Sequence, residues 1–356
     1  MKKYKSVVLI LNMFFSVFGR IYTSSAQNGF KIYLIGDAGD HLEEDGVLTN
    51  LQKELVSNPN SAVVFMGDNS YKDALWGILH FGFKGFDSTR NTMKKIRAQL
   101  DILKEYTGSA FFLPGNHDWW NRTTYERGRS KLAMEESFIE KNLKMNTSLA
   151  NPGKFFLPAN GDYGPEYVEL NHRSVRLVFI DTYRIIQSGI KKRKIPEEEK
   201  SFYARLDTVI GQGYVLKEKI IVLAHHPVYS MSPFNRTLKR PYLFRRIKAS
   251  SPGFPSYKAM SDGINTVLRH YPGIYYASGH LHALQYFYKD SIHYIISGAG
   301  SKEKILNIKD TRKYDASLSV DDFLLWNSGG FFELEFNDET KTTLHYENGS
   351  LKCFLP

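Results

Sequence analysis

Short hydrophobic runs recur along the chain, and each one ends at a group of glycine and polar residues. Apolar runs of this length, bounded by Gly or Pro, are typical of buried strands. The pattern predicts strands that lead directly into candidate functional sequences. These strands are Lys31–Ile35, Ala62–Met66, Phe111–Pro114, Ile220–Leu223 and Ile274–Ala277.

Segments with the 3.6-residue period of amphipathic helices lie between the strands, at His41–Val56, Asn91–Tyr106, Tyr125–Lys144, Pro196–Ile210 and Ser256–His270. Further strands are predicted at Tyr167–Leu170, Val175–Ile180, Leu284–Tyr288, His293–Ile296, Gly330–Phe336 and Thr343–Tyr346. The alternation within Gly330–Phe336 predicts a half-exposed strand. Strand, loop and helix in repeated order indicate an α/β fold, and so many strands favour sheets packed face to face with outer helices.

Composition narrows the class of protein. The chain has 356 residues, of which 42% are hydrophobic and 24% charged, and its formal charge is +10. These values exclude a disordered chain, a collagen and a multi-span membrane protein. Basic residues cluster at Lys191–Lys194 and Arg236–Arg246. No nucleic-acid-binding motif accompanies either cluster, so we expect no nucleic acid as a specific partner.

The first 26 residues have the pattern of a secretory signal peptide. Lysines at positions 2, 3 and 5 precede an apolar stretch, Val7–Phe18, and small residues follow at Ser24–Ala26. We therefore expect residues 1–26 to be removed, leaving a single catalytic domain over 27–356 in a secreted or periplasmic protein with no stable membrane span. The alternative is an uncleaved membrane anchor. Cys353 is the only cysteine, so the chain can form no internal disulfide. Core packing must therefore stabilise the domain.

Five polar sequences follow the first set of strands, and each contains residue types that bind metal ions. They are Gly36-Asp37-Ala38-Gly39, Gly67-Asp68-Asn69-Ser70-Tyr71, Gly115-Asn116-His117-Asp118, Val222-Leu223-Ala224-His225 and Gly279-His280-Leu281-His282. Two neighbouring metal ions can neutralise a phosphate ester, lower the pKa of bound water and hold it in line for attack. The five sequences together predict such a two-metal site.

These five sequences resemble those of the calcineurin-like metallophosphoesterases, and within them the small tartrate-resistant purple acid phosphatases. The resemblance extends over Lys31–Gly300 and includes His225–Ser230, Ser278–Tyr286 and Ser297–Gly300. It implies a layered α/β/β/α sandwich of two mixed sheets flanked by helices. It also implies hydrolysis of phosphomonoesters by attack of a metal-activated hydroxide.

One position separates the branches of this superfamily. Most members carry Asp-x-His in the first sequence, whereas this chain has Gly39 in place of the histidine. Purple acid phosphatases compensate with a tyrosine three residues after the second aspartate, and this chain has Tyr71 there. A phenolate is a hard anionic donor that suits Fe(III). Gly39 and Tyr71 therefore favour the iron-tyrosinate branch.

The resemblance assigns two metal ions, Fe(III) and a divalent Fe, Zn or Mn, to seven ligands. The first ion would bind Asp37, Tyr71 and His282; Asp68 would bridge both ions; the second ion would bind Asn116, His225 and His280.

The resemblance also suggests roles around the metals. His117 would contact the phosphate and protonate the leaving oxygen, and Asp118 would orient His117. The segment Met231–Tyr257 predicts a long loop and lacks the second active-site histidine of small purple acid phosphatases, so His226 or Asn235 could take that role. Arg236, Lys239 and Arg240 of this loop could bind a polyanionic substrate, or they could be solvated. Trp119 and Trp120 could stack on an aromatic leaving group, or they could be buried.

Four functions are compatible with these sequences, and redox chemistry at the iron pair is the fourth. An exported phosphatase acting on phosphomonoesters is the first. A phosphodiesterase or nucleotide phosphohydrolase on the same scaffold is the second, since substrate class depends on loops. A non-catalytic exported iron-binding protein is the third, although such a protein would be expected to lack at least one ligand.

Overall fold

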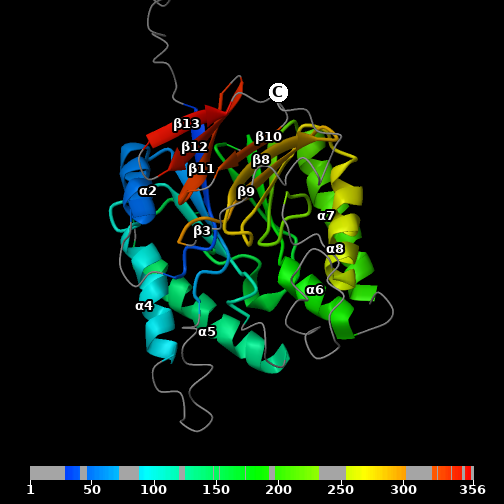
Figure 1. The fold of residues 1–356 in the computed structure, drawn as a ribbon, viewed down its shortest axis with the longest axis horizontal. Coiled ribbons are helices and arrows are strands. Elements are labelled where there is room, and N and C mark those ends of the chain that lie inside the picture. The colour runs from blue at the N-terminus through cyan, green and yellow to red at the C-terminus, as the bar shows by residue number, and fades with distance from the viewer. Residues whose placement is uncertain are drawn as a thin grey trace, which may run out of the picture.

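Two β-sheets pack face to face and carry helices on their outer sides (Figure 1). The computed structural model describes residues 29–40, 46–71, 88–119, 125–146, 148–151, 153–172, 174–191, 197–231, 254–301, 323–326, 328–337, 339–346 and 349–353. The expected α/β/β/α sandwich of two mixed sheets flanked by helices is confirmed.

The six-stranded sheet has the order β13-β12-β11-β1-β2-β3. Its strands are β1 (Phe30–Ile35), β2 (Ser61–Met66), β3 (Ser109–Leu113), β11 (Gly330–Phe336), β12 (Thr340–Tyr346) and β13 (Gly349–Cys353). The three early strands are parallel, and β11 joins β1 antiparallel, with Phe30 opposite Phe336. The carboxyl ends of β1, β2 and β3 therefore meet at one edge of the sheet.

The seven-stranded sheet has the order β10-β8-β9-β7-β6-β5-β4. Its strands are β4 (Glu166–Leu170), β5 (Val175–Phe179), β6 (Lys219–Leu223), β7 (Tyr275–Ser278), β8 (Leu284–Lys289), β9 (Ile292–Ser297) and β10 (Phe323–Trp326). Strands β5, β6, β7 and β9 are parallel to their neighbours in that series. Their carboxyl ends face the same side as those of β1 to β3.

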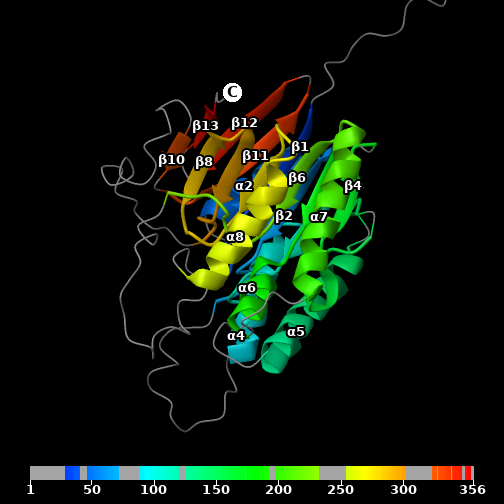
Figure 2. The same cartoon turned by 90° about the vertical axis from the view of Figure 1, so that its right-hand side faces the viewer.

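Helices cover both outer faces (Figures 1 and 2). α2 (Gly46–Ser57), α4 (Ser88–Asp101) and α5 (Tyr125–Lys144) belong to the six-stranded sheet. α6 (Thr182–Lys191), α7 (Glu197–Val215) and α8 (Pro255–Leu268) cover the seven-stranded sheet. A short 3-10 turn, η1 (Ala159–Gly161), precedes β4. No helix in the described ranges is long and apolar enough to cross a membrane.

Three hydrophobic layers hold this arrangement together. The central layer joins the sheets through side chains such as Leu34, Leu223 and Phe332, all fully buried. One outer layer joins α2, α4 and α5 to the six-stranded sheet, and the other joins α6, α7 and α8 to the seven-stranded sheet. Most of the parallel strands are buried on both faces, as sheets covered by helices require.

Several expectations differ from the structure. The helix expected over Asn91–Tyr106 ends at Asp101, and the helix expected over Pro196–Ile210 continues to Val215. Helix α6 was not predicted, because its sequence follows β5 without a loop and is rich in strand-favouring residues. The short strands β10 and β13 were not predicted either. The half-exposed state expected for Gly330–Phe336 is wrong, since Glu333 is only 4% exposed and forms an ion pair with Lys31 and a hydrogen bond with His345.

Candidate metal centre

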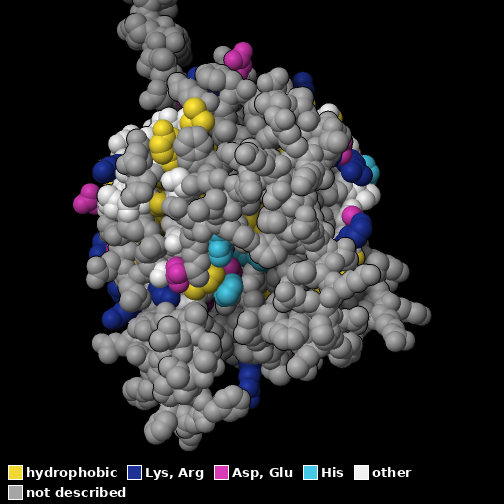
Figure 3. All heavy atoms as spheres, in the orientation of Figure 1, with side chains coloured by type: hydrophobic (Ala, Val, Ile, Leu, Met, Phe, Trp, Pro, Cys, Tyr) yellow, Lys and Arg dark blue, Asp and Glu magenta, His cyan; other side chains and the backbone are white. Residues whose placement is uncertain are grey.

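The loops after the parallel strands bring all ten predicted site residues to one edge of the sandwich. Ligands are expected at such an edge, where the carboxyl ends of strands meet. Histidine and acidic side chains gather on this face of the molecule (Figure 3). The residues are Asp37, Asp68, Tyr71, Asn116, His117, Asp118, His225, His226, His280 and His282.

The first predicted ligand group is assembled around Tyr71. Its hydroxyl donates a 2.6 Å hydrogen bond to Asp37 Oδ1 and lies 3.1 Å from His282 Nε2. His282 Nε2 lies 3.3 Å from Asp37 Oδ1. Atoms bound about 2 Å from one ion lie roughly 3 Å apart, so these three atoms are spaced like the ligands of a single metal.

The second group is assembled around His225. Its Nε2 lies 3.1 Å from Asn116 Oδ1, 3.3 Å from His280 Nδ1 and 3.4 Å from Asp68 Oδ1. The other ring nitrogen, Nδ1, is 2.9 Å from the carbonyl oxygen of Met66. This contact fixes the ring and leaves Nε2 for a metal, as ligating histidines require.

Asp68 connects the two groups. Ligand atoms of Asp37, Asp68 and His225 all lie within 4.8 Å of one another, and each residue is buried. Carboxylate, phenol, amide and imidazole donors in two adjacent sets suit a pair of transition-metal ions. The donor set therefore fits two metals with Asp68 between them.

The backbone is strained where it carries these ligands. Asp37, Asp68, His280 and His282 all have positive φ, between 50° and 72°. Few residues other than glycine adopt this region, and such strain persists where surrounding structure imposes it, often at functional sites. Four of the seven predicted ligands thus have a strained backbone, which places their side chains in the site at a cost in the stability of the folded chain.

Gly39 explains why the first loop supplies no histidine. A Cβ atom at this position would collide with the backbone of Asn69 and Ser70. The two loops are joined there, because Gly39 N–H donates to Asp68 O at 3.1 Å and Tyr71 N–H donates to Gly39 O at 2.9 Å. The same close approach that excludes a side chain at residue 39 places the Tyr71 hydroxyl beside Asp37.

Burial and charge shift the pKa values of the buried groups. Burial disfavours the charged form of Asp68, but the adjacent His225 and His117 outweigh it and hold the pKa well below its usual range. Burial also opposes protonation of His225, yet the Asp68 carboxylate raises its pKa to about 9. For Tyr71, burial and then the Asp37 and Asp68 carboxylates raise the pKa well above its usual value. Deprotonating this phenol requires a strongly polarising cation.

His117 lies beside the first ligand group. Its backbone N–H donates a 2.8 Å hydrogen bond to Asp68 Oδ1, and its ring centroid is 4.6 Å from that of Tyr71. The side chain is partly exposed, unlike most of the ligands. Contact of His117 with a substrate stays a prediction.

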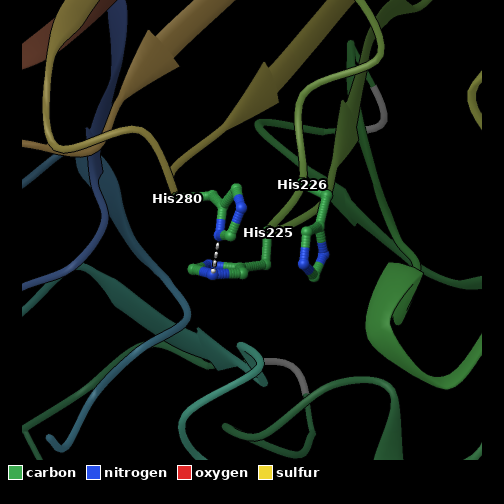
Figure 4. A group of neighbouring side chains, drawn as sticks. All are labelled: His225, His226 and His280. Atoms are coloured by element: carbon green, nitrogen blue, oxygen red, sulfur yellow. Dashed lines mark hydrogen bonds between the residues drawn. The ribbon is translucent and has the colours of Figure 1, made fainter. Parts of the chain in front are cut away.

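His226 is fully buried next to the second group (Figure 4). Its Nδ1 lies 2.9 Å from Thr182 Oγ1, and its ring centroid is 4.4 Å from that of His280. Burial, then His280 and His225, hold its pKa well below the usual range. His225, His226 and His280 form a further group with ligand atoms within 4.8 Å of one another.

Asp118 holds the ligand loops together. Its carboxylate accepts hydrogen bonds from the backbone N–H groups of Gly115 at 2.7 Å, Ser70 at 3.2 Å and Asn69 at 3.3 Å. Burial, then the nearby Glu135 and Asp68, raise its pKa well above the usual value. Orientation of His117 by Asp118 stays a prediction.

Sequence reasoning missed four residues that support the ligands. Glu135 on α5 accepts a 3.1 Å hydrogen bond from Asn69, and Thr182 holds His226. Lys95 and Gln99 on α4 donate to the carbonyl oxygens of Tyr71 and Asn69. All four lie on helices, within segments that carry no local motif.

The two alternatives for the tryptophan pair are resolved for one member. Trp119 is fully buried, and its Nε1–H donates a 2.7 Å hydrogen bond to Asp181 Oδ2. It therefore packs in the core and cannot stack on a leaving group. Trp120 and the loop residues Asn235, Arg236, Lys239 and Arg240 lie outside the described residues.

Comparisons with known proteins show the family and the fold of the chain. Residues 30–298 match the family model described as calcineurin-like phosphoesterase. No curated protein matches the chain. Three solved structures share the fold: PhoD (TM-score 0.58, 10% identity, 92% of this chain and 72% of that one), GAP50, the anchor in the inner membrane complex of Plasmodium (0.56, 14%, 93% and 90%), and a dimetal phosphatase from Danio rerio (0.52, 12%, 92% and 99%).

The family model covers more than half of the chain and includes every predicted site residue. Its range ends just after β9, so it also spans the parallel strands whose loops form the site. The chain belongs to the calcineurin-like phosphoesterase family and is a metal-binding hydrolase of phosphate esters.

Proposed function

We propose that this protein is an exported phosphatase of the purple acid type, hydrolysing phosphomonoesters. Fe(III) would be held by Asp37, Tyr71 and His282. The observation that carries the proposal is the 2.6 Å contact between the Tyr71 hydroxyl and Asp37 Oδ1, at a point where Gly39 leaves no room for a histidine.

The donor chemistry supports iron in the first position. Tyr71 and Asp37 offer two hard oxygen donors that are anionic once the phenol is deprotonated, and these suit a trivalent ion. His225, His280 and Asn116 offer two imidazoles and a neutral amide, which suit divalent Fe, Zn or Mn. Two such ions supply Lewis acidity and an activated water when bound.

The surrounding residues provide positioning and a proton. His117 would donate to a phosphate oxygen and then protonate the leaving group, because it is the partly exposed imidazole next to the Tyr71 ring. Asp118 would act indirectly, by holding the loop that carries Asn116 and His117. His226 would fix the ring of His280 from its buried position beside it.

Visible spectroscopy and metal analysis test the branch assignment. The purified protein should hold two metals per chain and show a tyrosinate–iron absorption band, which Tyr71→Phe should abolish. Tyr183→Phe is a matched control, since Tyr183 is also a buried tyrosine near the site but not a ligand. A band that survives Tyr71→Phe would show that the protein is a metallophosphoesterase of another branch.

Substrate class needs a separate assay. Turnover of an aryl phosphomonoester well above that of the matching diester is expected. The reverse preference would identify a phosphodiesterase on the same scaffold, and turnover of neither by fully metallated protein would identify a binding protein.

Export rests on the sequence of residues 1–26, and mass analysis of protein recovered outside the cytoplasm should show cleavage after Ala26.

A further inference from the structure

A second cluster of potential metal ligands lies away from the predicted metal centre, under helix α2. Glu54 comes from the second half of α2, Glu333 from β11 and His345 from β12. One ligand atom from each of the three lies within 4.8 Å of the other two. Helix α2 covers the outer face of the six-stranded sheet at this point (Figure 1). We call these three residues the α2 cluster, and none of them belongs to the predicted centre.

His345 lies between the two carboxylates of the cluster. Its Nε2 is 3.0 Å from Glu333 Oε2, and its Nδ1 is 3.8 Å from Glu54 Oε1. A neutral imidazole has a single N–H, so its other nitrogen presents a lone pair to a carboxylate. This repulsion is relieved by a second proton on the ring or by a cation that the three side chains share. The ring of Phe331 stacks on that of His345 and fixes its plane.

The charges around the α2 cluster leave one carboxylate without a counter-charge. Lys31 Nζ is 3.1 Å from Glu333 Oε1, whereas Glu54 Oε2 has only the side-chain amide of Asn58 at 3.5 Å. Burial opposes ionisation of Glu333, but the hydrogen bond with His345 and the charge of Lys31 outweigh it and lower its pKa. With a neutral imidazole, two carboxylates and one ammonium leave one negative charge, which attracts a cation.

A buried hydroxyl is directed toward the same cluster. Tyr33 on β1 pairs with Glu333 across the strands and is fully buried. Its hydroxyl oxygen has no hydrogen-bond partner among the residues that the structure describes. Burial, then the carboxylates of Glu333 and Glu54, raise its pKa, so these carboxylates lie near the hydroxyl. Buried hydroxyls are rarely left without a hydrogen bond, so this atom indicates that a further polar group binds here.

The donor types select the cation. Calcium and magnesium ions take oxygen ligands, so the imidazole of His345 argues against both. One imidazole and two carboxylates suit zinc, which accepts three protein ligands and a water molecule. Ligand atoms bound about 2 Å from one ion lie roughly 3–4 Å apart, close to the spacing of this cluster. Glu54 is the most exposed of the three side chains, at 34%, so it can turn to share one ion with the others.

We propose that the α2 cluster binds a zinc ion, which ties helix α2 to strands β11 and β12. The imidazole of His345 and one oxygen each from Glu54 and Glu333 would be the ligands. The Tyr33 hydroxyl would donate a hydrogen bond to the water in the fourth position, and Lys31 would keep its bond to the other oxygen of Glu333. Tyr33 precedes Asp37 by four residues, or ~13 Å of extended chain, so the site is distinct from the predicted centre.

The expected affinity follows from the ligands. With three protein ligands, one of them on the surface of a helix, the site should bind zinc reversibly and lose it in metal-free buffer. The purified protein would then keep only the metals of the predicted centre. The proposal does not depend on the chemistry of that centre.

Calorimetric titration with zinc chloride tests the site. The full chain is first loaded at the predicted centre and freed of excess metal, and it should then take up one further zinc ion per chain. Glu54→Gln should abolish this uptake, since it removes a ligand charge at a partly exposed position and keeps the size of the side chain. Tyr33→Phe should weaken it about tenfold, as loss of a supporting hydrogen bond around a metal does.

His270→Gln is the matched control. His270 Nδ1 lies 3.0 Å from Asp207 Oδ1 at the surface, but this pair belongs to no group of three potential ligands in the described part of the chain. The variant should bind the further zinc ion as the parent does. Equal loss in Glu54→Gln and His270→Gln would overturn the proposal and assign the uptake to surface histidines in general.

X-ray diffraction locates the ion without relying on a variant. Crystals of the parent protein held in excess zinc should give an anomalous peak, at the zinc absorption edge, between Glu54, Glu333 and His345. A further zinc ion found elsewhere, or unchanged uptake in Glu54→Gln, would contradict the proposal. If the parent takes up no further zinc, the α2 cluster is held together by a proton on His345 and not by a metal.

Discussion

Gly39 is the residue on which the separation of the two metal-binding loops depends. Because a Cβ atom there would meet the backbone of Asn69 and Ser70, Gly39→Ala must push the loops apart. We expect a loss of ~1–3 kcal/mol in the free energy of unfolding, typical of overpacking, and weaker retention of the first metal. Denaturant unfolding and metal analysis measure both quantities.

Gly153→Ala is the matched control for this change, since a Cβ atom at residue 153 would have nothing within 4 Å. It should leave metal content and stability nearly unchanged. If Gly39→Ala behaves like Gly153→Ala, the contact between the loops does not position the ligands.

Asp181 gives the protein a pH-dependent stability. Burial raises its pKa to about 7, although the N–H groups of Arg184 and Trp119 partly oppose the shift. A carboxyl whose pKa is higher in the folded than in the unfolded state binds its proton more tightly when folded. Its effect on stability is therefore most favourable below pH ~4 and is lost as pH rises through about 7.

We therefore predict that Asp181 lowers the free energy of unfolding by up to ~4 kcal/mol between pH 4 and 8. In Asp181→Asn, this part of the change in the free energy of unfolding with pH should disappear. The disturbed hydrogen bond to Trp119 should also lower the free energy of unfolding by ~1–3 kcal/mol at all pH values. Unfolding curves at several pH values measure the slope, and an unchanged slope in the variant would assign it to other groups.

Helix α4 holds the loop that carries Asp68 and Tyr71 through hydrogen bonds from two of its side chains. Lys95 is 2% exposed and donates to Tyr71 O at 2.9 Å, and Gln99 donates to Asn69 O at 2.7 Å. Lys95→Met should weaken binding of the first metal ~10–100-fold, as loss of supporting contacts around metal ligands does. Metal titration and the position of the visible band measure the effect.

Lys94→Met is the matched control, because Lys94 is the exposed neighbour on the same helix. Equal effects of the two substitutions would mean that α4 acts through general helix stability. A specific effect of Lys95→Met would show that the helix holds the ligand loop.

The predictable elements were those with a strong local pattern. The bounds of α5 and β11 are those that the sequence predicted, and the five strands that precede the predicted ligands were predicted within two residues. Helix α6 was not predicted because its formation depends on the burial of Ile185 and Ile186 against α8, which is distant in sequence. The burial of Glu333 could not be predicted from the sequence pattern, because helix α2 covers that face of the sheet.

The same distinction applies to the metal centre. Predicted ligands such as Asp37 and His225 follow strands directly, so local sequence and sheet geometry together place them at one edge. The supporting residues Lys95, Glu135 and Thr182 come from helices that reach the site through tertiary packing. Their roles could be found only from the structure.

At the scale of the whole molecule, the predicted metal centre would join the two sheets. Asp37, Asp68 and Tyr71 follow strands of the six-stranded sheet, and His225, His280 and His282 follow strands of the seven-stranded sheet. Each predicted metal has ligands from both, so each ion would cross-link the sandwich at its carboxyl edge. A metal that binds only to the folded chain stabilises it by an amount that grows with the logarithm of the free metal concentration relative to Kd.

Removing the metals should therefore lower the thermal stability of the entire domain. At a thousandfold excess of metal over its Kd, one site contributes ~4 kcal/mol, or about 5 °C in Tm for a chain of this size. Calorimetry of chelated and reloaded protein measures the change. In His282→Ala, which removes the seven-stranded sheet's ligand to the first metal, the difference should shrink by about half. A Tm that does not respond to chelation in the parent protein would mean that hydrophobic packing alone joins the sheets, and that the strained ligand backbones are held by the apoprotein itself.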